Sequence, residues 1–423
     1  PPPPSQSSSC VTSAIRADEF MAEVSSFDFL WGHWGSGRSS RRRAVEAAAP
    51  APPPDVVQVL TKQCDEVLAA NAASSSSSSQ AAGSVATPAA PVASVAGKEE
   101  LLQGVAASTQ RLLEVLEADA TEGEEGLVHR ILLADLPWKL LTILRILDFE
   151  ARKAVIRLVG LLMRMTPKQQ ASKQSLAQPV TDADAAAQAL SIRKARDGEE
   201  VTNYICSHPQ ILMALLDGFL DVEVFFLCAQ LVQTCAENLT VAKELYRVDR
   251  VDAINRLLTL SHNNNFDISC EAFATLRTLL LVQKKLASRY LIEQFQEFFE
   301  SFHHFLRPEE DGYTILRQAL RLLGELLLDA SFNEVMKRYV AEDVFLQIHM
   351  NLLRSDSVPV QLDAFHIFKI FVANPARPDR VERILRKNRD RLVRLLDAFW
   401  PKHQDDVGFT EDLKAIVGML QLL

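Results

Sequence analysis

Hydrophobic and polar residues follow a helical period over most of the chain after Glu99. Six apolar residues in the first such segment keep the 3.6-residue spacing of one helix face: Leu101, Leu102, Val105, Leu112, Leu113 and Leu116. Short breaks separate further segments of this kind almost to the C-terminus. Leucine, alanine, arginine and glutamate, which occur readily in helices, dominate this region, and the 423 residues include only 15 glycines. The pattern predicts an all-α fold.

The predicted helices also repeat. Ala272-Phe273 and Ala364-Phe365 occur in similar helical contexts, and Ala319 occupies the same place in the helix between them, at intervals of 47 and 45 residues. Armadillo and HEAT units have this length. Because one such unit cannot bury its apolar face alone, neighbouring units must stack. We therefore predict an armadillo/HEAT-like helical-repeat solenoid, a curved rod of stacked helices.

The first 97 residues have a different composition. They begin with four prolines, contain a six-serine run from Ser74 to Ser79, and remain rich in alanine, proline and serine up to Gly97. Such a segment buries too little apolar surface to offset its ordering entropy. We expect 1–97 to be a low-complexity, mostly disordered N-terminal tail that adds little to stability, with one helix near 55–69. The repeat domain is expected over 98–423, with 166–200 as an inserted loop because its periodicity lapses.

Charge and cysteine content narrow the classes of partner and location. The net charge is -9 and the pI is near 5.6, which makes nucleic acid and anionic membranes poor partners. No apolar run reaches the roughly 18 residues of a membrane span. The six cysteines lack CxxC spacing and lie mostly in apolar or helical stretches, so we interpret them as core thiols. A cytoplasmic protein fits best.

No catalytic constellation is evident in the sequence. Motifs for a phosphate-binding loop, a nucleophile elbow, a zinc protease helix and an EF-hand are all missing. His303 and His304 are adjacent, so they point to different helix faces and do not suit a metal. Asp148 and Glu150 flank a predicted helix start, where N-capping explains them more simply than acid–base chemistry. The sequence predicts no enzyme activity, metal, cofactor or small-molecule substrate.

One predicted helix, around Tyr313 to Asp329, carries charged residues beside its apolar stripe. Arg317, Arg321 and Glu325 follow one another at four-residue intervals. The simpler interpretation is a solvated face with an Arg321–Glu325 ion pair. The alternative is a pair of arginines facing a groove that binds a partner's carboxylates. The spacing leaves both interpretations open.

Six segments carry a resemblance to a known family, in the same order along the chain from roughly residue 99 to 399. They are Leu-Asp-Phe-Glu at 147–150, Asn-Tyr-Ile-Cys at 203–206, and the segments 266–275, 322–329, 350–354 and 364–375. Together they resemble the Mo25 family, also called the calcium-binding protein 39 family. The resemblance implies an armadillo-like scaffold without enzymatic activity. Its implied partners are a STE-related adaptor pseudokinase and germinal-centre, sterile-twenty-like kinases, which it would bind and activate in intracellular signalling.

The resemblance also implies two binding surfaces. The first is a pocket for a pseudokinase peptide that ends in Trp-Glu-Phe. Arg317 and Met350 match its residues, and Arg321 stands in place of a family lysine and keeps the charge. The second is a concave surface that faces the kinase, and the residues that match it are Lys153, Tyr313 and Lys387. A methionine adapts to an aromatic ring, and an arginine can pair with a carboxylate.

One departure from the family pattern separates two functional hypotheses. The family arginine that directly follows the Leu-Leu-Leu-Asp run is Ala330 here, and Phe332 stands one position early. The peptide pocket is therefore expected to be retained, whereas the surface that presses on the kinase is altered. The alternative function is a general helical-repeat adaptor in cell polarity or division, which kept the peptide pocket without kinase activation. The sequence does not identify the partner kinase.

Overall fold

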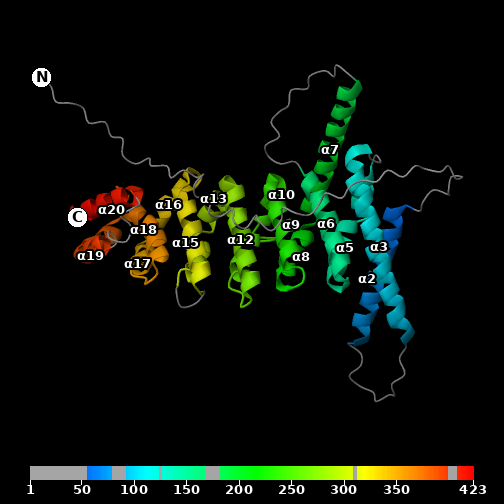
Figure 1. Ribbon diagram of the computed structural model, residues 1–423, viewed down its shortest axis with the longest axis horizontal. Helices are drawn as coiled ribbons and strands as arrows, with labels where there is room; N and C mark the ends of the chain where they lie inside the picture. Colours follow the sequence, from blue (N-terminus) through cyan, green and yellow to red (C-terminus); the bar gives the residue numbers. More distant parts are fainter. Residues whose placement is uncertain (1–54, 79–91, 123–125, 167–181, 308–311, 399–406) are drawn as a thin grey trace, which may run out of the picture. The chain divides into compact units, whose positions relative to one another are not determined.

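A computed structural model describes residues 55–78, 92–122, 126–166, 182–307, 312–398 and 407–423. Every regular element in these ranges is a helix. The chain divides into two compact units, Pro1–Pro53 and Pro54–Leu423, and all described residues belong to the second. Within this unit the helices succeed one another in chain order (Figure 1). The predicted all-α, helical-repeat fold is confirmed.

The helices of the second unit have the following bounds: α2 Val56–Ser78, α3 Val92–Glu122, α4 Leu127–Leu133, α5 Leu136–Ile143, η2 Leu144–Ile146, α6 Phe149–Met165, α7 Asp182–Ser207, α8 Pro209–Asp217, η3 Gly218–Leu220, α9 Phe225–Glu237, α10 Leu239–Leu245, α11 Ala253–Leu260, α12 Phe266–Val282, α13 Lys284–Glu293, α14 Phe295–His304, α15 Gly312–Leu328, η4 Ala330–Phe332, α16 Asn333–Tyr339, α17 Asp343–Leu352, α18 Val358–Ala373, α19 Asp379–Asp397 and α20 Val407–Gln421. The elements labelled η are short 3-10 helices. Short connections between most of these helices account for the breaks in the hydrophobic pattern.

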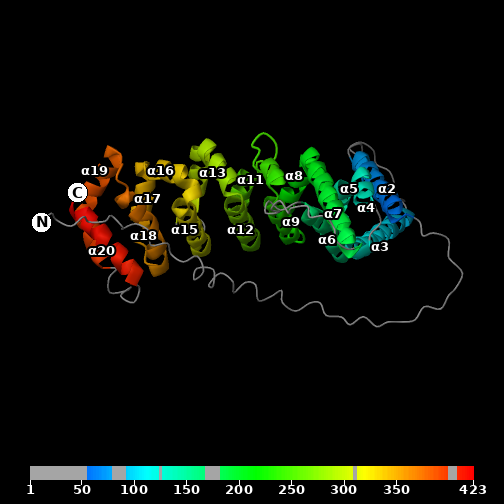
Figure 2. The ribbon, with the colours of Figure 1, turned by 90° about the horizontal axis from the view of Figure 1, so that it is seen from above.

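One helix of each repeat packs against the equivalent helix of the next repeat. These helices, which we call the repeat row, are α3, α6, α9, α12, α15, α18 and α20, and each contacts the next. They form one of the two layers visible in Figure 2. Ala272, Ala319 and Ala364 lie on α12, α15 and α18 with no exposed surface. The predicted register is therefore confirmed, with a small buried residue at equivalent positions of three successive helices.

Polar contacts between neighbours fix the direction of the helices in the repeat row. At the C-terminal ends of α9 and α12, Gln283 Nε2 donates hydrogen bonds to the carbonyl oxygens of Ala236 and Glu237 at 3.1 and 3.2 Å. In the C-terminal halves of α12 and α15, Arg277 Nη2 donates to the two carboxylate oxygens of Glu325 at 2.9 and 3.0 Å. Because each contact joins the same end of both helices, α9, α12 and α15 run parallel, and the 3.5 Å contact of Cys235 Sγ with Met163 Sδ aligns α6 with α9 in the same way. Their N-terminal ends therefore lie along one edge of the row.

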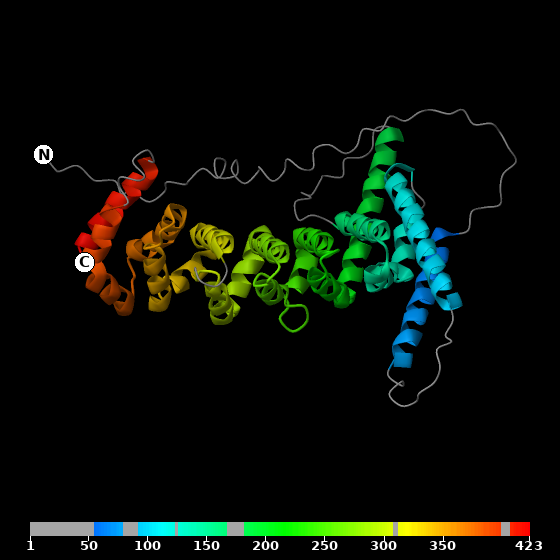
Figure 3. The same ribbon diagram turned by 60° about the horizontal axis from the view of Figure 1, so that its bottom comes forward.

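The folded region begins earlier than the predicted residue 98, which lies inside α3. Helix α2 packs against α3, blue and cyan in Figure 3. Its apolar face is at most 4% exposed at Val57, Leu60, Cys64 and Val67. The boundary differs because the packing partner of α2 follows only after an intervening segment, so local composition does not reveal it. The part of the predicted disordered tail up to residue 54 lies outside the described residues.

The inserted loop predicted over 166–200 is wrong for its second half. Helix α7 begins at Asp182 and continues to Ser207. Its first turns are alanine-rich, and alanine has the highest helix propensity, although the apolar periodicity used for the prediction is weak there. Further along, Val201 and Ile205 are buried where α7 packs against α6. Residues 167–181 lie outside the described part of the chain.

The C-terminal repeats contain a buried polar network among aromatic rings. The Tyr339 hydroxyl lies 3.0 Å from His303 Nε2 and 2.8 Å from His349 Nε2. Among the described residues, His349 Nδ1 has no hydrogen-bond partner. Because a buried N–H without a partner is rarer than an unpaired acceptor, we assign the His349 proton to Nε2. His349 then donates to the Tyr339 oxygen, and Tyr339 donates to His303. Burial lowers the pKa of both imidazoles, so both are neutral near pH 7.

The cysteines agree in part with the prediction of core thiols. Three are buried, and burial raises their pKa to about 12: Cys64, Cys228 and Cys235. Cys206 and Cys270 are half-buried, and Cys10 lies outside the described residues. A thiol with a raised pKa carries little thiolate at neutral pH and reacts slowly. In the described helices, none is both long and apolar enough to cross a membrane.

Candidate functional site

Arg317, predicted to line the peptide pocket, lies on α15 and contacts α18. Its Nε donates a hydrogen bond to Asp363 Oδ2 at 3.2 Å, and Arg321 Nε lies 3.9 Å from the same oxygen. The Asp363 side chain is 14% exposed, whereas those of Arg317 and Arg321 are 34% and 30% exposed. Burial raises the pKa of Asp363, although both guanidinium groups oppose this shift. Two half-exposed arginines therefore surround one largely buried carboxylate.

The structure adds contacts that the sequence analysis did not predict. The Arg317 guanidinium, which the resemblance assigns to a ligand, is bonded at Nε to Asp363 within the fold. Glu325, which the simpler interpretation paired with Arg321, pairs with Arg277 of α12. Both partners, Asp363 and Arg277, come from neighbouring repeats 46 and 48 residues away, so spacing within one helix did not predict them. No hydrogen bond from the terminal nitrogens of Arg317 is found within the described residues.

Met350, the predicted apolar residue of the pocket, lies on α17 and is half-buried against the core. Helices α15 and α17 both pack against α18. Arg317 and Met350 are therefore on two helices that share one neighbour. A thioether that is only partly buried retains surface on which an aromatic ring can pack.

The residues predicted to face a kinase do not form one cluster. Lys153 lies on α6, with Nζ 3.1 Å from Glu150 Oε1 and 4.3 Å from the centroid of the Phe149 ring. Tyr313 lies in the first turn of α15, and α9 and α12 separate these two helices in the repeat row. Lys387 is exposed on α19, which is outside the repeat row. These residues are spread over much of the second unit.

Exposed aromatic residues lie at the starts of four successive helices of the repeat row, from α6, which carries Lys153, to α15, which carries Tyr313. Each is the first or second residue of a helix in the repeat row, and together we call them the aromatic row: Phe149, Phe226, Phe266 and Tyr313. Their exposed fractions are 57%, 39%, 62% and 51%. Because the helices are parallel, these four residues lie along the same edge. Aromatic residues exposed at equivalent positions of successive repeats are suited to binding a partner protein.

Helix caps explain why two of these rings, Phe149 and Phe266, point away from the core. The sequence analysis did not use these caps, and it therefore did not predict the aromatic row. Asp148 Oδ1 accepts a hydrogen bond from Ala151 N at 2.8 Å, which confirms its predicted capping role. Asn265 Oδ1 accepts from Asp267 N at 3.0 Å. A capping residue followed directly by phenylalanine fixes the aromatic side chain at the first helical position, before the apolar stripe begins. The recurrence of this pair in two repeats could have indicated the row.

The departure from the family pattern lies in η4, after α15. Ala330 is exposed, whereas Phe332 has no exposed surface. Asp329 accepts a hydrogen bond from Ser331 N at 2.8 Å and pairs with Lys284 Nζ at 2.6 Å. The segment is therefore anchored by its neighbours, and a methyl group occupies the surface position where the resemblance implies an arginine.

Comparison with known proteins defines the family. The sequence profile described as Mo25-like matches residues 49–423, which include α2 and every later helix. The chain belongs to the Mo25-like family. An algal relative, the degreening-related gene dee76 protein of Auxenochlorella protothecoides, is 30% identical over 307 residues, covering 73% of this chain and 85% of its own length. The human calcium-binding protein 39-like protein is 28% identical over 322 residues, covering 75% and 86%. The Mo25-like protein of Schizosaccharomyces pombe is 32% identical over 221 residues, covering 52% and 66%.

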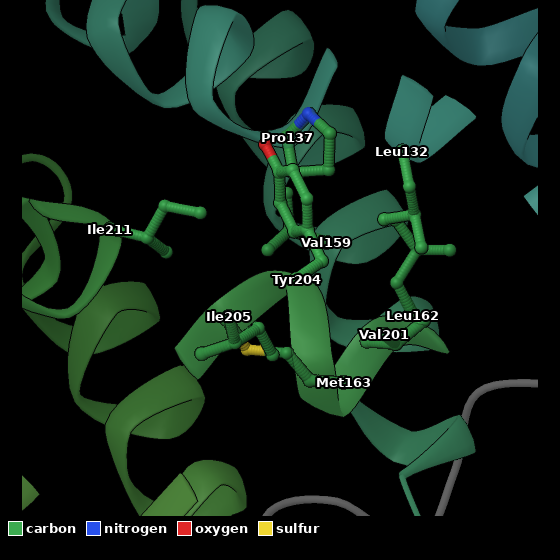
Figure 4. Close-up of a pocket in the computed structure, with 9 residues that line it drawn as sticks. All are labelled: Leu132, Pro137, Val159, Leu162, Met163, Val201, Tyr204, Ile205 and Ile211. Carbon is green, nitrogen blue, oxygen red and sulfur yellow. The ribbon is translucent and has the colours of Figure 1, made fainter. Parts of the chain in front are cut away.

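One cavity inside this Mo25-like chain, shown in Figure 4, is too small for a ligand. Its volume is about 10 Å³, roughly the space of one water. Its lining is apolar except for Tyr204, whose hydroxyl donates to Asp135. In the described parts of the chain, no group of three histidine, cysteine or acidic residues is arranged to hold a metal ion.

Proposed function

We propose that this Mo25-like chain is a non-catalytic cytoplasmic scaffold that binds protein kinases or pseudokinases and activates them. Family membership supports a role in protein binding. The observation that carries the proposal is that Arg317 and Met350 lie on α15 and α17, which both pack against α18. Arg317 is half-exposed, and Asp363 of α18 holds its Nε. The arrangement offers a cation and a polarizable apolar surface to a peptide that carries carboxylate and aromatic groups.

A partner's C-terminal Trp-Glu-Phe peptide would use both kinds of group. An aromatic ring would pack on Met350, and a carboxylate would accept hydrogen bonds from the terminal nitrogens of Arg317. The contact with Asp363 holds the guanidinium in one orientation, which lowers the entropy lost on binding. Arg321 would add positive charge beside the same site.

The aromatic row would provide the second contact, with the body of the kinase. Lys153 lies beside Phe149 at one end of this row, and Tyr313 is at the other end. Two separate contacts on one stack of helices would hold a kinase domain more firmly than either alone, because the second contact forms within the complex. A kinase held in this way could be biased toward its active conformation.

The test is fluorescence titration with a labelled peptide that ends in Trp-Glu-Phe. Arg317→Ala is expected to weaken binding by about 10- to 100-fold, as loss of a charge-assisted hydrogen bond of about 1.5–3 kcal/mol does. The matched control is Arg289→Ala, since Arg289 is an exposed arginine on α13. Circular dichroism establishes that both variants keep their helices. Equal peptide affinity of Arg317→Ala and Arg289→Ala would refute the proposed use of Arg317.

The alternative function is a helical-repeat adaptor that binds the peptide without activating a kinase, in cell polarity or division for example. The exposed methyl group of Ala330 favours it, because the resemblance implies an arginine at this surface position. The two functions differ in one measurement, the activity of a captured kinase with and without this chain. Scaffold activation predicts increased kinase activity that Phe266→Ala reduces. Peptide binding with unchanged kinase activity would favour the adaptor.

A further inference from the structure

Helix α19 carries a continuous line of positive charge. Five cationic residues, which we call the cationic stripe, follow one another at intervals of three or four residues, and all are exposed: Arg380, Arg383, Lys387, Arg391 and Arg394. This spacing matches the helical period, so the five side chains lie on one face. The opposite face is buried, because Val381, Leu385, Leu392 and Leu396 are at most 4% exposed.

The acidic residues of α19 do not neutralise the stripe. Arg386 pairs with Glu382 at 2.5 Å and Arg389 with Asp390 at 3.0 Å, and these arginines lie outside the stripe. Within the stripe, Arg383 Nε donates to the Asp379 carbonyl at 3.2 Å and Arg394 Nε donates to the Asp390 carbonyl at 3.1 Å. Over the described residues, no stripe residue has a carboxylate oxygen within 4.0 Å of a side-chain nitrogen.

This arrangement has an energetic cost within the helix. Four neighbouring pairs of like charge arise, from Arg380–Arg383 to Arg391–Arg394, and each destabilises a helix by a few tenths of a kcal/mol. The cost is local, because the chain as a whole carries a net charge of -9. A bound anion of matching length would remove the repulsion.

We propose that the cationic stripe binds a carboxylate-rich polypeptide segment of a partner protein. The stripe spans about 21 Å, which corresponds to about six extended residues of a partner. Arginine binds carboxylates through two parallel hydrogen bonds. The net charge of -9 repels nucleic acids and anionic bilayers, which extend well beyond the stripe, and the apolar face of α19 is buried and therefore cannot insert into lipid. An acidic peptide, which meets only the stripe, avoids both difficulties.

This inference goes beyond the proposed function, because the stripe lies on α19 and does not depend on Arg317 or Met350. Lys387 alone belongs to both proposals, so it is left unchanged in the experiment. The full chain is titrated with fluorescein-labelled octaglutamate, and binding is followed by fluorescence anisotropy in 50 mM and 300 mM NaCl. Binding is expected to weaken at the higher salt concentration, because exposed charge pairs are screened.

The test variant is the triple change Arg380→Glu, Arg383→Glu and Arg391→Glu. It is expected to weaken octaglutamate binding by about tenfold or more, since three attractive contacts become repulsive. The control is the triple change Arg111→Glu, Lys285→Glu and Arg289→Glu, which alters net charge equally at exposed positions outside α19. A change of less than about twofold is expected for the control. Equal losses in the two variants would overturn the proposal.

Additional titrations distinguish a polypeptide ligand from nucleic acid and lipid, and they distinguish the cationic stripe from the proposed Trp-Glu-Phe site. If the glutamate variant loses helix content, the triple change of the same three arginines to glutamine replaces it and is expected to weaken octaglutamate binding in the same direction. Tighter binding of single-stranded RNA or phosphatidylserine vesicles than of octaglutamate would overturn the assignment to a polypeptide. The stripe variant should bind the Trp-Glu-Phe peptide like the unmodified chain, so failure at one surface is distinguishable from failure at the other.

Discussion

Removal of the Tyr339 hydroxyl is expected to destabilise the C-terminal repeats strongly. Tyr339→Phe keeps the ring and removes the oxygen that joins His303 to His349. The two imidazoles then lose their shared partner at buried positions, where His349 is 0% exposed and His303 is 7% exposed. Each buried polar group left without a partner costs about 1–3 kcal/mol. The free energy of unfolding should therefore fall by about 2–5 kcal/mol.

Urea unfolding of the full chain measures this loss, and hydrogen exchange in α16, α17 and α18 locates it. The second readout is needed because a repeat stack need not unfold in a single step. Tyr313→Phe is the matched control, since Tyr313 is 51% exposed and its change should cost less than about 0.5 kcal/mol. If Tyr339→Phe costs no more than Tyr313→Phe, the hydroxyl does not hold the two histidines as described.

Two further predictions concern acid and the first helix. Burial lowers the pKa of His303 to about 4 and of His349 to about 3, below the unfolded value near 6.5. Below pH 6.5 the unfolded chain therefore binds more protons than the folded chain. The free energy of unfolding should fall between pH 6.5 and pH 4 by about 1.4 kcal/mol per pH unit for each histidine. If His349→Gln leaves this pH slope of urea unfolding unchanged, the prediction is wrong. Leu60→Ala should cost about 2–4 kcal/mol because Leu60 is 0% exposed, whereas Lys62→Ala, at an 81% exposed side chain, should cost almost nothing. Unchanged amide protection of α2 and α3 in Leu60→Ala would mean that α2 adds little to stability, as first expected for residues 1–97.

The repeat architecture could be predicted from the sequence because its signal is local and periodic. Ala272, Ala319 and Ala364 recur in helices whose apolar stripes are complete within each segment. The placement of α2 could not be predicted in this way. Its buried residues Val57, Leu60, Cys64 and Val67 keep the helical period, as the predicted helix near 55–69 requires, but whether that helix packs depends on contact with α3. Composition describes the segment, whereas packing decides whether it is ordered.

The candidate site shows the same division between local and distant information. The capping role of Asp148 involves residues three positions apart, and the prediction is confirmed. The partner of Arg317 is 46 residues away in the next repeat, so the spacing of residues within α15 could not reveal it. The use of Arg317, Met350, Arg321, Lys153, Tyr313 and Lys387 in binding stays a prediction, because it rests on the family resemblance.

Parallel packing of equivalent helices has a consequence for how such a chain can bind partners. A residue type placed at one helical position in successive repeats becomes a row on the surface, as the exposed aromatic residues at the starts of α6, α9, α12 and α15 illustrate. The cationic stripe arises differently, from the period of the single helix α19. The two surfaces have different chemistry and lie on different helices. A partner that engages both must therefore present an apolar surface and an acidic segment at separate places.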